Sequence, residues 1–234
     1  YDQAFDLSIA AAHEFGWYCR NTGYNPFTLE GKKTAAFEIW EWWVSLRRLP
    51  GESFDGPLAV FVSVGDGNII SGIHKGFEDL GALGWFETMP RIFGVQAEGS
   101  AAIARAWAAG VETITPVSAH TLADSISVDL PRDGVRAVRA AAQTGGAYLT
   151  VSDAQILAGI AALGREGIFA EPAGAAAFAG LGVAVEQGLV SPETPVLVVN
   201  TGSGLKDVGA AARSVPAAPI IEPTLAAVKQ LFPK

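Results

Sequence analysis

The sequence is nearly devoid of sulfur, with one cysteine (Cys19) and one methionine (Met89) in 234 residues. A single cysteine excludes an intrachain disulfide framework and is typical of a reducing compartment, so we expect a cytoplasmic protein. The first residue is Tyr1 rather than methionine. We therefore expect the chain to be a fragment, a processed product or a trimmed version of a longer protein.

The sequence also has few charges and no long apolar segment. Only 17% of its residues are charged, and the net charge of −8 leaves no basic face to attract nucleic acid. No apolar run approaches the length of a membrane-spanning helix, and no signal peptide opens the chain. These absences exclude nucleic acid and membrane as the expected main partners.

The sequence contains short continuous apolar runs, which are typical of buried strands, in alternation with segments whose apolar residues have helical spacing. We expect strands at 58–64, 91–97, 147–151 and 194–199, with short strands at 17–19 and 168–171. We expect helices at 4–15, 34–46, 69–80, 100–109, 134–143, 154–165 and 173–187. We expect a linker at 50–57 and an irregular loop over a site at 111–130. This order predicts an α/β protein with a doubly wound, mostly parallel sheet and a ligand site where the strands end.

The clearest candidate for that site follows the apolar run 58–64. Gly65-Asp66-Gly67-Asn68 interrupts the run, and helical spacing begins at Ile69. Glycines let a ligand approach the backbone, and the free N–H groups and dipole of a helix N-terminus favour an anion. A phosphate site and an ordinary tight turn both fit this pattern. A dinucleotide fits poorly, because the third glycine of that fingerprint would stand at Ile70.

Four sequence blocks in family order resemble those of threonine synthases. They are Asn25–Glu38, with the pattern Asn-Pro-x-x-x-Glu-Gly-x-Lys-Thr, then Val64–Ile69, Glu171–Ala176 and Thr201–Asp207. Threonine synthases are pyridoxal-phosphate enzymes of the tryptophan-synthase-β-like fold, also called fold type II. The resemblance therefore implies that fold, with its N-terminal part missing, and pyridoxal 5'-phosphate as the cofactor.

The resemblance also implies the residues that would bind the cofactor. The cofactor phosphate would lie on the glycine-rich turn, and a threonine hydroxyl would meet the pyridine nitrogen: Gly65, Asp66, Gly67, Asn68, Ile69 and Thr201. A turn residue that caps its own backbone is the alternative for Thr201. We predict that Gly67→Val lowers cofactor affinity and leaves the fold intact.

Two departures from the family pattern bear on activity. The Schiff-base lysine of the family lies upstream of this region, and none of the six lysines stands in its motif, so the catalytic residue is unknown. Thr28 stands where the family has an arginine that binds the substrate phosphate, and Asp66 stands where asparagine is frequent. Asp66 could instead cap the following helix. We expect poor handling of phosphohomoserine unless Lys32 or an upstream residue compensates.

These observations predict two units and one reaction class. Residues 1–50 would end a small domain and return to the large one, and 51–234 would form the large cofactor-binding domain. The predicted reaction is elimination of phosphate from O-phosphohomoserine with addition of water at the β-carbon, catalysed only with the N-terminal segment present. A serine or threonine dehydratase-like enzyme and a non-catalytic remnant are the alternatives. Expected partners are an amino-acid substrate, a second copy in a homo-oligomer, and the N-terminal segment as a separate chain.

Overall fold

A four-stranded parallel sheet forms the centre of the computed structural model, which describes residues 2–47, 56–85 and 88–232. The strands, in the spatial order β3-β2-β1-β4, are β1 (Ala59–Ser63), β2 (Arg91–Ala97), β3 (Ala147–Val151) and β4 (Val196–Val199). In the register of the sheet, Val62 pairs with both Gly94 and Val199, so β1, β2 and β4 end at the same edge. The predicted α/β class and parallel sheet are confirmed.

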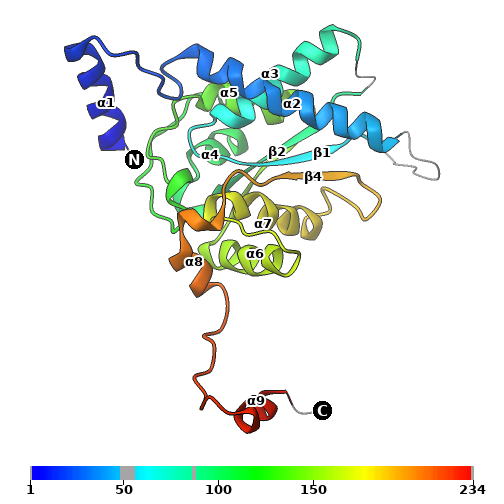
Figure 1. Cartoon of the computed structure of the whole chain (residues 1–234). Coiled ribbons are helices and arrows are strands. Elements are labelled where there is room, and N and C mark those ends of the chain that lie inside the picture. Colours follow the sequence, from blue (N-terminus) through cyan, green and yellow to red (C-terminus); the bar gives the residue numbers. More distant parts are fainter. Residues whose placement is uncertain (1, 48–55, 86–87, 233–234) are drawn as a thin grey trace.

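Helices cover both faces of this sheet (Figure 1). One face carries α2 (Pro26–Arg47), α3 (Asn68–Ala82), α4 (Ala102–Ala108) and α5 (Gly134–Thr144). The other carries α6 (Asp153–Arg165) and α7 (Pro172–Glu186). The described residues also contain α1 (Asp2–Phe15), α8 (Val208–Arg213), α9 (Leu225–Leu231) and short 3₁₀ turns at Glu98–Ser100, Asp124–Ile126 and Gly204–Lys206.

Strand β1 shows why the sheet is buried on both sides. Its side chains alternate between the two faces, so Val60 and Val62 pack under α3, whereas Phe61 stacks on Phe93 at 4.7 Å between ring centroids. All five residues of β1 are buried. A continuous apolar run is the expected sequence of such a strand.

Two glycines of α3 bring α2 unusually close. A Cβ atom placed on Gly72 would lie 2.6 Å from Cβ of Lys32, and one on Gly76 would lie 2.6 Å from Cβ of Ala36. Larger residues at these two positions would push the helices apart. The glycines therefore hold Lys32 beside the N-terminal half of α3.

Three expected strands differ from the structure. Residues 17–19 form no strand, and 168–171 contribute only an isolated bridge between Ala170 and Ser203. The strand expected at 194–199 is shorter, with β4 at Val196–Val199, and the apolar side chains of β4 are only half-buried. The reason is that β4 pairs, within the described part of the chain, with β1 alone and so lies at an edge of the sheet.

The first long helix begins earlier than its apolar spacing suggests. Helix α2 starts at Pro26 instead of Thr34, because proline suits the first helical position and the side-chain oxygen of Asn25 accepts the N–H of Phe27 at 3.0 Å. Most of the predicted linker 50–57 lies outside the described residues.

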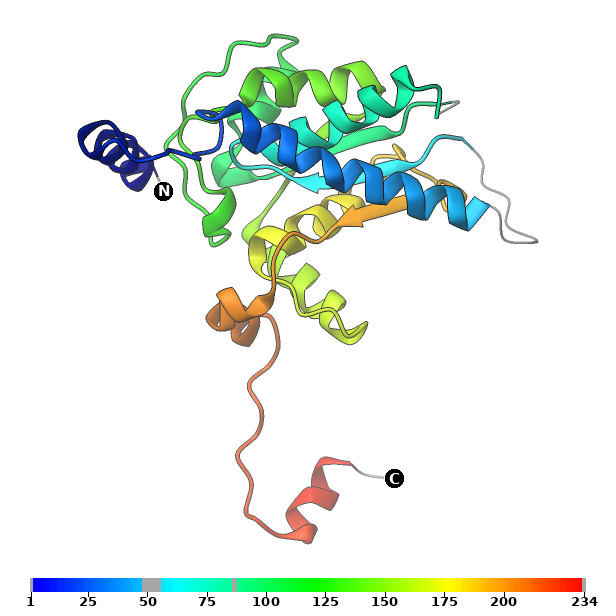
Figure 2. The same cartoon turned by 45° about the horizontal axis from the view of Figure 1, so that its top comes forward.

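The two ends of the chain stand away from the sheet (Figures 1 and 2). Helix α1 is linked to the body by Arg132, whose guanidinium lies 3.4 Å from Asp2 and 4.4 Å from the ring centroid of Phe5. The segment after α8 runs outward and ends in α9. No helix among residues 2–47, 56–85 and 88–232 has the length and apolarity needed to cross a membrane. The division into units 1–50 and 51–234 stays a prediction.

Candidate functional site

A cavity of about 250 Å³ opens where β1 and β4 end. This strand-end cavity is lined by all six residues predicted to bind a cofactor: Gly65, Asp66, Gly67, Asn68, Ile69 and Thr201. They meet because the carboxyl ends of neighbouring parallel strands lie at one edge of a sheet, where α/β proteins bind ligands. The structure thus brings them together, and their role in binding stays a prediction.

The floor of the cavity is the turn between β1 and α3. Gly67 is the N-cap of α3 and has a φ of 88°, which a residue with a side chain rarely adopts. The first helix-type hydrogen bond that follows runs from the N–H of Ser71 to the carbonyl of Gly67 at 3.1 Å. The N–H groups of the preceding helical residues have no intrahelical acceptor by the geometry of a helix start. They are therefore the groups that can hold an anion.

A second loop fixes the shape of this turn. The N–H of Arg132 donates to the carboxylate of Asp66 at 3.1 Å, and the N–H of Asp133 donates to its carbonyl at 2.9 Å. The side-chain amide of Asn68 donates to the carboxylate of Asp133 at 2.5 Å. Asp66 therefore braces the turn from the side and is not the N-cap of α3, so that alternative was wrong.

The side-chain oxygen of Asn68 is left without a partner. Asn68 is only 3% exposed, and this buried oxygen accepts no hydrogen bond from any described residue. Buried polar atoms in folded proteins nearly always have a partner in the protein, in ordered water or in a ligand. The site is thus incomplete without a further hydrogen-bond donor.

The opposite wall joins two sequence blocks that are far apart in the chain. The N–H of Glu171 donates to the carbonyl of Gly202 at 3.0 Å, and that of Gly204 donates to the carbonyl of Phe169 at 2.9 Å. A Cβ on Gly202 would lie 2.0 Å from a carboxylate oxygen of Glu171. The glycine therefore lets the loop that follows β4 and carries Thr201 pass directly beside a buried carboxylate.

Glu171 is paired with Lys206 at 2.8 Å, and the two side chains differ greatly in exposure, at 6% and 58%. We expect Lys206→Met to lower the free energy of unfolding by about 1–3 kcal/mol, because it leaves a buried carboxylate without its partner. Glu171→Gln should cost less than about 1 kcal/mol, because the ammonium that remains is solvated. Urea unfolding of both variants measures the difference. Equal losses would show that the burial of Glu171 does not decide the energy.

Ten of the sixteen residues that line the cavity were not assigned to the cofactor site from the sequence, among them Ser125, Ile126 and Lys32. Ser125 and Ile126 come from the irregular stretch 111–130, which confirms that this loop reaches a cavity. Lys32 comes from α2, and its pKa is lowered by burial, an effect that Asp133 and Asp66 oppose by attraction. Nothing in the local pattern around Lys32 indicates that it faces the turn at Gly65–Ile69.

Thr28, the predicted substrate-binding residue, does not line the strand-end cavity. Its hydroxyl donates to the carbonyl of Arg20 at 3.0 Å. Thr28 and Lys32 are four residues apart on one helix, which places them on the same face one turn from each other. Of these two residues, Lys32 lines the strand-end cavity and Thr28 does not.

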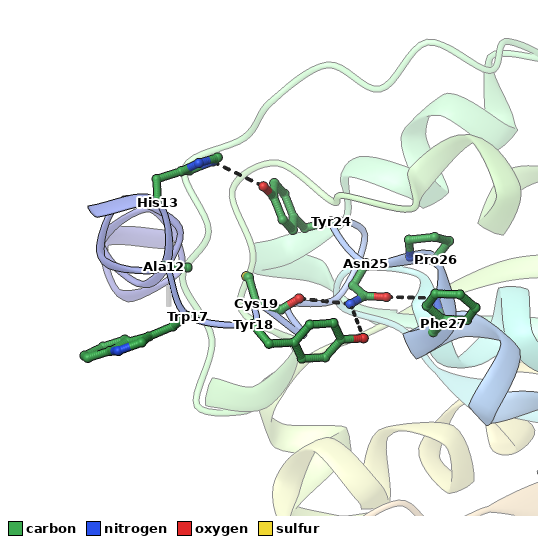
Figure 3. A pocket seen from close by; sticks show the side chains of 9 residues that line it. All are labelled: Ala12, His13, Trp17, Tyr18, Cys19, Tyr24, Asn25, Pro26 and Phe27. Atoms are coloured by element: carbon green, nitrogen blue, oxygen red, sulfur yellow. Dashed lines mark hydrogen bonds between the residues drawn. The ribbon is translucent and has the colours of Figure 1, made fainter. Parts of the chain in front are cut away.

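Asn25 and Pro26, the first two residues of the Asn-Pro block, line a separate cavity of about 340 Å³ (Figure 3). The amide of Asn25 donates to the hydroxyl of Tyr18 at 2.7 Å and to the carbonyl of Cys19 at 2.9 Å. These bonds hold the chain as it enters α2. The described residues contain no group of three or more histidine, cysteine or acidic side chains arranged to hold a metal.

Comparison with known proteins agrees with this geometry. Residues 1–202 match the family described as pyridoxal-phosphate dependent enzyme. The chain is 35% identical to the threonine synthase of Methanocaldococcus jannaschii over 219 residues, which cover 92% of this chain and 51% of that protein. It is 33% identical to the threonine synthase of Mycobacterium tuberculosis over 234 residues, which cover 99% of this chain and 60% of that protein. The chain thus spans about half the length of the curated relatives it matches, and the predicted resemblance is confirmed.

Solved structures of more distant proteins share the fold. Diaminopropionate ammonia lyase from Escherichia coli superposes with a TM-score of 0.71 at 18% identity, covering 92% of this chain and 55% of that one. Threonine deaminase isoform 2 from Solanum lycopersicum superposes with a TM-score of 0.66 at 22% identity, covering 89% and 56%. At these identities the similarity establishes the architecture alone.

Proposed function

The chain belongs to the family of pyridoxal-phosphate dependent enzymes, and from this premise we propose that the strand-end cavity is its cofactor site within a threonine-synthase-like lyase. The observation that carries the proposal is the turn at Gly65–Ile69, whose residues line a cavity that Thr201 also lines. A helix N-terminus with close backbone access can bind a phosphate dianion without a lysine or arginine.

The residues present fit both ends of the cofactor. The glycine-rich turn, braced by Asp66 and Arg132, offers backbone donors for the phosphate. Thr201 offers a neutral hydroxyl for the pyridine nitrogen, where an aspartate would keep that nitrogen protonated. When bound, the cofactor supplies an electron sink that favours loss of a leaving group from an amino acid. The cavity volume lies slightly below the range of about 300–1,000 Å³ usual for small-molecule sites, as suits a small cofactor.

The chain's own residues would act by holding and orienting. The N–H groups of the turn would hold the phosphate, and the Thr201 hydroxyl would donate a hydrogen bond to the ring nitrogen. The loop that carries Ser125 and Ile126 borders the same cavity. The overall reaction we propose converts O-phosphohomoserine and water to threonine and phosphate. Two assays on the longest natural form of the protein distinguish this reaction from that of a dehydratase. One measures release of phosphate and formation of threonine from O-phosphohomoserine, and the other measures release of ammonia from serine or threonine.

The proposed lysine nucleophile lies outside these 234 residues, as the family resemblance implies. We therefore expect this chain to bind pyridoxal phosphate reversibly and to carry no stoichiometric pyridoxyl group on any lysine after borohydride reduction. Absorbance titration followed by peptide mapping tests both parts. One lysine labelled in a one-to-one ratio would contradict the assignment of the nucleophile. Absence of any binding would contradict the cofactor site and favour a non-catalytic remnant.

A further inference from the structure

Lys32 is a half-buried cation that lacks an ion pair in the described part of the chain. The other lysines of the body are paired: Lys33 lies 2.7 Å from Asp79, Lys75 also contacts Asp79, and Lys206 lies 2.8 Å from Glu171. No described carboxylate comes within ion-pair distance of Lys32, although it lines the strand-end cavity. An unpaired ammonium that loses part of its hydration is costly, so its position calls for an anion.

The carboxylates nearest to Lys32 are engaged elsewhere. Asp66 accepts the N–H of Arg132, and Asp133 accepts the side-chain amide of Asn68. Both attract Lys32 over a longer distance without neutralising it by contact. Burial lowers the pKa of Lys32 below its ordinary value, which is the expected direction for an ammonium without a close partner.

The position of Lys32 is fixed by the packing of α2 on α3. A Cβ on Gly72 would lie 2.6 Å from Cβ of Lys32 and 3.1 Å from the carbonyl of Leu29. Gly72 lies one turn into α3, counted from Asn68 at its first residue. This close approach places the backbone end of the Lys32 side chain beside the first turns of α3. Lys32 lines the same cavity as the turn at Gly65–Ile69.

We propose that Lys32 binds a second oxyanion in the strand-end cavity, the phosphate of an O-phosphorylated amino-acid substrate. The inference rests on the proposed function, in which the N–H groups of the turn are already occupied by the cofactor phosphate. Two phosphate dianions in one cavity repel each other, and a charge-assisted hydrogen bond from a fixed ammonium offsets that repulsion. A lysine ammonium acts as a point charge and suits phosphate, whereas the planar fork of arginine suits carboxylates as well.

The test uses the 234-residue chain saturated with pyridoxal phosphate. It is titrated by calorimetry with O-phospho-L-homoserine, with L-homoserine and with inorganic phosphate. Lys32→Gln removes the charge and Lys32→Arg keeps it. Lys229→Gln is the matched control, because Lys229 lies exposed on α9 and outside the cavity.

We expect Lys32→Gln to weaken binding of the phosphorylated amino acid and of inorganic phosphate by about 10–100-fold, the range of a hydrogen bond to a charged group. Affinity for L-homoserine and for pyridoxal phosphate should change less than about twofold by the same reasoning. Lys32→Arg should retain most of the affinity for phosphate. Lys229→Gln should leave the affinity for all four ligands unchanged. Thermal unfolding of each variant confirms that the fold is intact.

Three outcomes would overturn the inference. Equal weakening of L-homoserine would assign Lys32 to the substrate carboxylate. Weakening of pyridoxal phosphate would assign it to the cofactor phosphate. Unchanged affinity for all ligands would leave Lys32 without an anion. A parent chain that binds no pyridoxal phosphate would contradict the proposed function instead, and phosphate titration of the unliganded parent and Lys32→Gln chains would still decide the role of Lys32.

Discussion

Gly67→Val is expected to lower the free energy of unfolding by about 2–5 kcal/mol. A left-handed backbone costs a residue with a Cβ about 1–2 kcal/mol, and Gly67 has a φ of 88°. Overpacking adds about 1–3 kcal/mol, because the new Cβ would lie 2.7 Å from Cβ of Ala137. Urea unfolding monitored by fluorescence measures the loss. The packing around Gly67 therefore adds an expected loss of stability to the loss of cofactor affinity predicted from the sequence.

A matched glycine separates the two causes. Gly110 has a φ of 68° and no heavy atom within 4 Å of an added Cβ. Gly110→Val should therefore lose only the backbone part, about 1–2 kcal/mol. If the two valine variants were equally stable, the contact with Ala137 would not matter, and the tight packing of the turn against α5 would be disproved.

Ile69→Asp is expected to weaken pyridoxal-phosphate binding by about 100–1,000-fold, and this variant isolates binding from folding. Ile69 lines the cavity at the second position of α3. Two unit charges 4 Å apart repel by about 4 kcal/mol near a protein surface, and every 1.4 kcal/mol corresponds to about a factor of ten. A carboxylate in the first turn is favourable for the helix itself, by about 0.3–1 kcal/mol, so the fold should survive.

The control for this variant is Ile69→Asn, which has nearly the same shape as aspartate and no charge. Both substitutions lose the same apolar contacts of Ile69, which packs at the margin of the core. In absorbance titrations, the affinity of Ile69→Asp for pyridoxal phosphate should therefore lie below that of Ile69→Asn by most of the expected factor of about 100–1,000. Added salt should reduce this difference in affinity, because it screens the repulsion between the charges. Equal affinities of the two variants would remove the Gly65–Ile69 turn from the phosphate site.

Residues that are close in the chain were well predicted. The run 58–64, the glycine-rich turn at 65–68 and the helix after it follow one another directly in the chain. The structure shows them as β1, the turn before α3 and α3 itself. Ser152 caps the helix predicted at 154–165, accepting the N–H of Gln155 at 3.2 Å. Such features depend on backbone sterics and on hydrogen bonds between near neighbours, which the local sequence specifies.

The sequence correctly placed Thr201 with the distant Gly65–Ile69 turn, but it did not predict two other contacts across the fold. Asp66 was assigned to the ligand or, alternatively, to a helix cap, and the sequence did not indicate that its carboxylate accepts the N–H of Arg132, 66 residues away. Thr28 was assigned to the substrate, whereas Lys32 is the residue of α2 that reaches the cavity. Which turn of a helix faces a site depends on how the helix packs on its neighbour, here through Gly72 and Gly76.

The order of most strands and helices, the glycine-rich turn after β1 and the family resemblance could all be recognised from the sequence alone. Apolar period and turn chemistry act over a few residues, so they can be recognised without the fold. The strand order β3-β2-β1-β4, the approach of Gly202 to Glu171 and the position of Lys32 in the cavity became known from the three-dimensional structure. These arrangements join segments tens of residues apart, and they are selected by the close packing of whole elements.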